Sequence, residues 1–280
     1  MDKATQAQKA SLLKRLHHGP KILVLANAWD VISARIVEEI GFPAIATTSA
    51  GVAATLGYPD GQRVSCDEML NVVGRIARAV QVPVTADMEA GYGTTPADMA
   101  ETARALIDAG AVGLNLEDMT GDGPSSQVEL GLQLEKISAI REASAAARVP
   151  LVINARTDIY LTPIGPAETR FDRTVERLRA YARAGADCVF APAVKDPETI
   201  ERLAKVVGAP LNILLLPGGP NLNELERLGA ARASIGSGLM RTTLGTARSL
   251  AKAMFERRDT EAMFAEAVPY AEVNRLLGRA

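Results

Sequence analysis

The chain has 280 residues, of which 48% are hydrophobic and 23% are charged, and its net charge is -2. This length can bury a substantial core, as one large α/β domain or two smaller ones. The near-neutral charge gives no basic patch of the kind that binds nucleic acid or an anionic membrane. No apolar run approaches the roughly 20 residues that span a bilayer. The polar segment 1–20 lacks the apolar core of a signal peptide, so we expect a cytoplasmic protein without a membrane or nucleic-acid partner.

Histidine and cysteine are scarce: the sequence holds only His17, His18, Cys66 and Cys188. This shortage argues against a disulfide scaffold, a Cys/His zinc site and a Ser-His-Asp triad. Both histidines precede the first predicted strand, and Cys188 falls within a later one, so we expect none of these three at a catalytic end of the fold. The chemistry is therefore expected to use carboxylates, arginine, hydroxyl groups and backbone amides.

Short apolar runs alternate with segments of helical periodicity along the chain. A helix is predicted at 3–17, within an N-terminal segment 1–20, and another at 259–278, within a C-terminal extension 257–280. Continuous apolar runs are typical of buried parallel strands, and they predict strands at 21–26, 44–48, 82–87, 112–117, 150–156, 187–192, 211–216 and 232–237. Helices are predicted at 30–40, 66–80, 96–109, 129–147, 168–184, 196–207, 221–229 and 238–256, and residues 50–61 are predicted as a long loop.

The residues that start and stop these segments agree with the alternation. Gly41 and Gly110 follow predicted helices, as glycine does at a left-handed C-cap, and Pro96 and Pro197 occupy predicted first turns. Eight strand–helix units predict a single (β/α)8 barrel domain over residues 1–280. An open doubly wound sheet is the alternative, but no G-x-G-x-x-G motif follows the first strand.

Carboxylates gather where neighbouring strands end. Asp87 and Glu89 follow the third predicted strand, Glu117 ends the fourth, and Asp60 lies in the long loop after the second. Barrel enzymes place their chemistry at the carboxyl ends of the strands, so we expect these four acids to converge. Like charges repel unless a cation neutralises them, and an all-oxygen set favours Mg2+ or Mn2+. The alternative is that each acid only caps a following helix.

Strand five supplies two further candidates, Asn154 and Arg156. The guanidinium of Arg156 can hold a carboxylate or phosphate through two hydrogen bonds. We expect it to face the acid site across the barrel and to bind a substrate with two separated anionic groups. The alternative is an ion pair with Asp158 or Asp87.

The end of strand two provides hydroxyl and amide donors at Ser49, Ala50 and Gly51, which can stabilise a developing oxyanion. Trp29 follows strand one and is predicted either to line the pocket or to pack on the barrel rim. Tyr92 is predicted either to carry a proton or to belong to the core.

Several of these residues fall within recognisable motifs. The segment 87–93, D-M-E-A-G-Y-G, resembles the D-x-[DE]-x-G-Y-G motif of the isocitrate lyase/phosphoenolpyruvate mutase superfamily. Residues 116–118 resemble its L-E-D, residues 154–158 its A-R-x-[DE] strand, and residues 49–51 with 57–60 its S-G…G-x-x-D segment. The resemblance runs in order through residues 20–250.

This resemblance implies a barrel whose eighth helix is often swapped between subunits of a dimer or tetramer. It implies Mg2+ held by Asp87, with water-mediated help from Asp60, Glu89 and Glu117. It also implies a 2-oxo acid substrate, with the amides of residues 49–51 on the oxyanion and Arg156 on the far anionic group.

The sequence also departs from the better-known branches. Residues 119–126, M-T-G-D-G-P-S-S, lack the K-[KR]-C-G-H motif of isocitrate and methylisocitrate lyases and the K-T-N-type signature of the mutase and phosphonopyruvate hydrolase. Decarboxylation of a 3-carboxy-2-oxo acid needs no base, because carbon dioxide leaves directly and the enolate is stabilised by a metal and amides. We therefore expect a Mg2+-dependent carbon–carbon lyase, with oxaloacetate as the leading substrate and substituted malates still open. The alternatives are P–C bond chemistry, of the phosphonopyruvate hydrolase or phosphoenolpyruvate mutase type, and a catalytically weak carboxylate-binding barrel.

Overall fold

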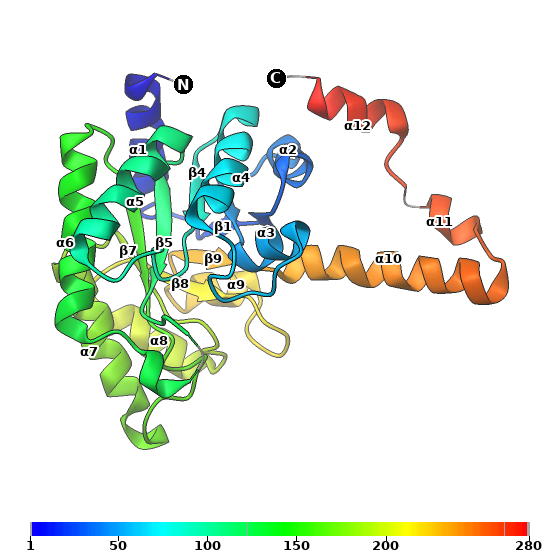
Figure 1. The fold of residues 1–280 in the computed structure, drawn as a ribbon. Helices are drawn as coiled ribbons and strands as arrows, with labels where there is room; N and C mark the ends of the chain where they lie inside the picture. The colour runs from blue at the N-terminus through cyan, green and yellow to red at the C-terminus, as the bar shows by residue number, and fades with distance from the viewer. Residues whose placement is uncertain (1, 122, 266, 279–280) are drawn as a thin grey trace.

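The computed structural model describes residues 2–121, 123–265 and 267–278. In this part of the chain every strand pairing is parallel, in the order β1-β9-β8-β7-β6-β5-β4-β3-β2 (Figure 1). The strands are β1 (Leu23–Leu25), β2 (Asn27–Ala28), β3 (Ile45–Thr47), β4 (Val84–Asp87), β5 (Gly113–Glu117), β6 (Val152–Arg156), β7 (Cys188–Phe190), β8 (Leu211–Leu214) and β9 (Arg232–Ser234). Because β1 and β2 follow each other along the chain with only Ala26 between them, they act as one barrel strand that runs two residues past the predicted 21–26, and the order closes on itself. The predicted (β/α)8 barrel is confirmed.

Helices alternate with the strands, and most of them cover the barrel. They are α1 (Lys3–Leu16), α2 (Val31–Ile40), α3 (Ser49–Leu56), α4 (Cys66–Ala79), α5 (Pro96–Ala109), α6 (Leu130–Ala146), α7 (Arg170–Arg183), α8 (Pro197–Val206), α9 (Leu222–Arg227), α10 (Gly238–Arg257), α11 (Glu261–Ala265) and α12 (Tyr270–Leu277). Two short 3-10 turns, η1 (Pro124–Ser126) and η2 (Ala167–Thr169), precede α6 and α7. The start of α5 illustrates the local chemistry: the Thr95 side chain accepts a hydrogen bond from the Asp98 amide, Pro96 opens the helix, and Gly110 ends it with φ 100°.

The prediction of a long loop at 50–61 is wrong over its first part, because residues up to Leu56 form α3. Thr48 accepts a hydrogen bond from the Gly51 amide at the start of this helix, and Gly57 ends it with φ 86°. The run between these caps is rich in alanine, the residue with the highest helix propensity. Only the remainder of the predicted loop, which carries Asp60, connects α3 to α4 without regular structure.

The prediction of one continuous helix at 259–278 is also wrong, because α11 and α12 are separate. Pro269 lies directly before α12, where its missing N–H is tolerated, but a helix running through that position would lose a hydrogen bond. Residue 266, in the same predicted helix, lies outside the described residues. The last helix packs on α2, where the Arg35 Nε donates to the Leu276 carbonyl at 2.8 Å.

The α10 helix extends away from the barrel, as Figure 1 shows in orange. Several of its apolar side chains are exposed, including Leu244, Met254 and Phe255. A helix that leaves its own barrel with an exposed apolar surface is compatible with the predicted swap between subunits. The swap itself stays a prediction. No helix in the described ranges is both long and apolar enough to cross a membrane.

Candidate active site

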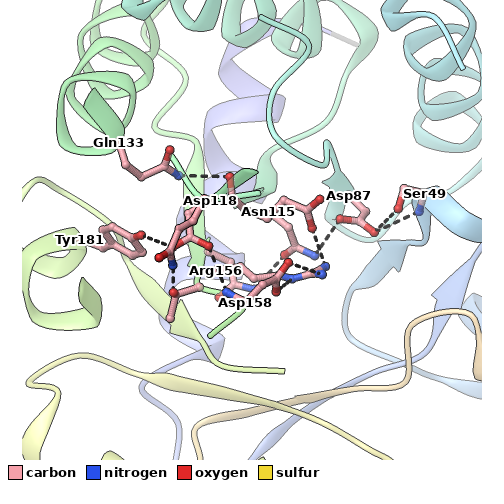
Figure 2. Close-up of polar contacts among 12 residues, drawn as sticks. Ser49, Asp87, Asn115, Asp118, Gln133, Arg156, Asp158 and Tyr181 are labelled. Carbon is pink, nitrogen blue, oxygen red and sulfur yellow. Dashed lines mark hydrogen bonds and ion pairs between the residues drawn. The ribbon is translucent and has the colours of Figure 1, made fainter. Parts of the chain in front are cut away.

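Asp87, the last residue of β4, lies at the centre of the candidate site (Figure 2). Its Oδ2 accepts two hydrogen bonds from Ser49, one from the amide at 3.0 Å and one from the hydroxyl at 2.8 Å. Its own amide donates to the Thr47 Oγ1 at 2.9 Å. By contrast, within the described ranges its Oδ1 accepts only a long hydrogen bond from the Asn115 Nδ2, at 3.4 Å. One carboxylate oxygen is thus firmly held, and the other retains free lone pairs.

Glu89 lies on a strained turn directly after this strand. Both Glu89 and Tyr92 have positive φ, 49° and 61°, which is unfavourable for residues with side chains. The Tyr92 hydroxyl donates to the Glu89 Oε1 at 3.1 Å, while its ring packs against the core. Burial, together with the charges of Asp87 and Asp60, raises the pKa of Glu89 to about 7. Burial and the neighbouring Glu89 raise the pKa of Tyr92, so its hydroxyl stays protonated and can donate.

Arg156 ends β6 and lies beside Glu117, its register partner on β5, rather than across the barrel from the acids as expected. Its Nη1 contacts the Glu117 Oε2 at 2.7 Å, while Nε and Nη2 contact the two oxygens of Asp158 at 2.6 and 2.9 Å. The predicted alternative, an ion pair with Asp158, is therefore present. Burial, with the charges of Asp158, Asp87 and Glu89, raises the pKa of Glu117, and Arg156 opposes this rise.

Asp60 completes the set of four acids from an exposed loop. Partial desolvation of its carboxyl group, with the charge of Asp87 adding to it, raises the pKa of Asp60. The four acids therefore act on one another, and Arg156 and the buried Arg232, which interacts with Asp87, oppose their charge. Such an excess of negative charge favours a bound cation.

The donor set fits Mg2+ or Mn2+ in a water-rich coordination. Within residues 2–121, 123–265 and 267–278, no three His, Cys, Asp or Glu side chains lie close enough together to ligate one metal directly. Mg2+ commonly takes only one or two carboxylates and keeps several waters. Asp87 Oδ1 carries only the long bond from Asn115 among the described residues, and Glu89, Glu117 and Asp60 all interact electrostatically with Asp87.

The other predicted residues divide between the site and its supports. Ser49, Ala50 and Gly51 form the first turn of α3, where the Ser49 amide already donates to Asp87 and the Gly51 amide to Thr48. A substrate oxyanion would have to compete with these bonds. Trp29 packs against this turn so closely that a Cβ on Gly51 would lie 2.9 Å from the Trp29 Cβ.

Asn154 lies deeper than predicted. It is fully buried, and its Nδ2 donates to the Asn115 Oδ1 at 2.8 Å. Its side chain therefore supports Asn115 from inside the barrel. Asn115, which the sequence reasoning missed, links Asn154 to Asp87. An asparagine in the middle of an otherwise apolar strand was the available signal, because buried amides need partners.

Asp118 is the second residue that sequence reasoning did not assign to the site, although it belongs to the L-E-D motif. It is completely buried, and its Oδ1 accepts from the Asp158 amide at 3.0 Å. Its Oδ2 accepts from the Arg177 Nη1, the Tyr181 hydroxyl and the Thr157 hydroxyl (Figure 2). These bonds fix the backbone of Asp158, which in turn holds Arg156.

Comparisons with known proteins identify the family. The family model described as phosphoenolpyruvate phosphomutase matches residues 13–255. An uncharacterized protein of Mycobacterium tuberculosis strain H37Rv is 34% identical over 262 residues, 94% of each chain. Oxaloacetate decarboxylase 2 of Pseudomonas fluorescens is 30% identical over 239 residues, covering 80% of this chain and 79% of the relative. A Burkholderia cenocepacia structure, with its activity given only as lyase/mutase, has a TM-score of 0.90 and 36% identity, covering 97% of this chain and 96% of its own.

The family model covers most of the chain, and the matched segment contains the barrel and all four acids. The chain therefore belongs to the phosphoenolpyruvate mutase family, within the isocitrate lyase/phosphoenolpyruvate mutase superfamily.

Proposed function

We propose that this protein is a Mg2+-dependent carbon–carbon lyase that decarboxylates oxaloacetate or a closely related 2-oxo acid. The observation that carries the proposal is that three carboxylates, those of Asp60, Glu89 and Glu117, interact with the carboxylate of Asp87, with Arg156 paired to one of them. The similarity to an oxaloacetate decarboxylase of Pseudomonas fluorescens supports this substrate. Because the chain belongs to this family, we expect an enzyme of the lyase or mutase type.

Asp87 would hold Mg2+ or Mn2+ through Oδ1, with Glu89, Glu117 and Asp60 acting through water. When bound, the metal would draw electron density from the 2-oxo group and stabilise the enolate. The bond between C3 and C4 of oxaloacetate breaks, carbon dioxide leaves, and the electron pair remains as the enolate of pyruvate. Ser49 keeps the Asp87 carboxylate in place through its amide and hydroxyl donors.

Arg156 would bind the carboxylate at the far end of the substrate. Three of its N–H directions are used by Glu117 and Asp158, and a guanidinium has five donors, so two remain for an anion. The Tyr92 hydroxyl is the candidate proton donor to C3, because it is protonated at neutral pH and is hydrogen-bonded to Glu89 beside Asp87. Glu89, with a pKa of about 7, accepts the Tyr92 hydrogen bond and is placed to restore that proton.

The test is pyruvate release from oxaloacetate by the purified protein with Mg2+, measured through coupled lactate dehydrogenase. We expect release well above the spontaneous rate, and its loss when a chelator is added. Asp87→Asn should abolish the metal-dependent rate and leave the circular dichroism spectrum unchanged. Asp108→Asn is the matched control, because Asp108 is an exposed acid on α5. No metal-dependent release, or equal rates for the two variants, would contradict the proposal.

A second candidate is P–C bond chemistry, which the family model for phosphoenolpyruvate phosphomutase favours. Phosphorus NMR of the protein with phosphonopyruvate and Mg2+ distinguishes it, since hydrolysis yields free phosphate and mutation yields phosphoenolpyruvate. Calorimetry that detects oxalate binding without turnover of either substrate would instead support a carboxylate-binding barrel.

A further inference from the structure

Arg232, the first residue of β9, is a buried cation that the proposed reaction does not use. Its side chain is fully buried, and in the described part of the chain it forms no ion pair. Its Nη2 donates to the Asn115 Oδ1 at 3.3 Å, while Nε and Nη1 have no hydrogen-bond partner among the described residues. Asp87 opposes the charge of Arg232 only at a distance, without a direct ion pair, and a cation buried in this way is unfavourable and needs a reason.

The bond between Arg232 and Asn115 crosses the interior of the barrel. Strand β9 is separated from β5 by three strands, β6 to β8, on one side of the ring. The interior of such barrels is usually filled by branched apolar side chains. Here it contains a polar chain instead, because Asn115 accepts from Arg232 and Asn154 and donates to Asp87. Figure 2 shows Asn115 between Asp87 and Arg156.

Arginine has only donors, and this fixes which way the Asn115 amide points. The atom that faces Arg232 must be the carbonyl oxygen Oδ1, so the Nδ2 group faces Asp87. Asn154 could not fix this orientation alone, because its own amide can present either a donor or an acceptor. The Asp87 carboxylate, which only accepts, favours the same orientation from one side, and Arg232 adds the second constraint from the other side of the Asn115 amide.

We propose that Arg232 is a positioning residue that acts through Asn115 to keep a hydrogen-bond donor on Asp87 Oδ1. With Ser49 on Oδ2, this donor would hold the carboxylate in one orientation before a metal binds. This inference rests on the proposed role of Asp87 as the metal ligand. The polar side chains inside the barrel, Arg232 and Asn115, would thereby support the site at the ends of the strands.

The test is a double-mutant cycle on Mn2+ affinity, measured from the EPR signal of free Mn2+ without any substrate. Arg232→Lys keeps the charge but loses the fixed planar donors. We expect Arg232→Lys and Asn115→Ala each to weaken Mn2+ binding about tenfold. In the Asn115→Ala background, Arg232→Lys should change the affinity less than twofold, because residues that act through one another are not additive. Arg35→Lys, another buried arginine, on α2, is the control and should leave Mn2+ affinity unchanged.

A second measurement follows the Asn115 side-chain amide by 15N NMR. Its exchange with solvent should be slow in the unmodified protein and in Arg35→Lys, and faster in Arg232→Lys. Equal losses of affinity from Arg232→Lys in both backgrounds, no loss from Asn115→Ala, or an unchanged Asn115 signal would overturn the proposal. If the unmodified protein binds no Mn2+, the metal-dependent function fails, and the NMR comparison still decides whether Arg232 orients Asn115.

Discussion

His17 provides a quantitative prediction for the stability of the barrel at low pH. The residue caps the end of α1 and is only 4% exposed. Its Nδ1 lies 2.8 Å from the Leu13 carbonyl, and its Nε2 has no partner among the described residues. Burial, with the charge of Arg232 in second place, lowers the pKa of His17 from 6.5 to about 4.

Because the folded chain holds His17 in its neutral form, the unfolded chain takes up a proton at higher pH than the folded chain does. The contribution of neutral His17 to the free energy of unfolding is therefore complete above pH 6.5, and it is lost as the pH falls from 6.5 to about 4. At about 1.4 kcal/mol for each unit of pKa, the full loss is about 3 kcal/mol, and about 2 kcal/mol of it has occurred by about pH 5.

The assay is urea unfolding at about pH 7.5 and about pH 5, followed by the fluorescence of Trp29, the only tryptophan. His17→Gln should remove about 2 kcal/mol of the stability loss between the two pH values. His18→Gln is the matched control, since it changes the adjacent exposed histidine, and it should retain the full loss. Equal pH dependence in the unmodified protein and His17→Gln would refute the reasoning.

Three further predictions concern the site and the assembly. Arg156→Lys loses the two bonds to Asp158, so the KM for oxaloacetate should rise about tenfold in steady-state assays, and an unchanged KM would contradict the anion-binding role. Gly51→Ala places a Cβ against Trp29, so the free energy of unfolding in urea should fall by about 1–3 kcal/mol and the tryptophan emission should shift. An unchanged emission would argue against this contact. Phe255 is 85% exposed on α10, so Phe255→Asp should convert an expected dimer or tetramer into monomers in light scattering, and an unaltered mass would count against a subunit contact there.

The alternation of apolar runs and amphipathic segments was enough to predict the barrel. The strands and most of the helices that link them can be recognised from the local periodicity of apolar residues. Pro96 marks the start of a helix and Gly110 its end, through their own backbone geometry. The four acids could be assigned to one end because parallel strands share a direction. Helix α3 and the break before α12 were missed, since short helices carry too few turns for a clear period.

The sequence by itself determined the fold class, the family and the carboxylates that follow neighbouring strands. Only the tertiary structure decided how their charges are arranged. Arg156 lies beside Glu117 because β5 and β6 pair in that register, and Arg232 reaches Asn115 although 117 positions separate them in the chain. Such contacts depend on closure of the barrel, which brings opposite strands within hydrogen-bond distance and which no local pattern encodes. Because the sequence has few histidines and cysteines, it predicts a site whose ligands are oxygen atoms. The folded barrel shows which amide and guanidinium groups support the carboxylates of that site.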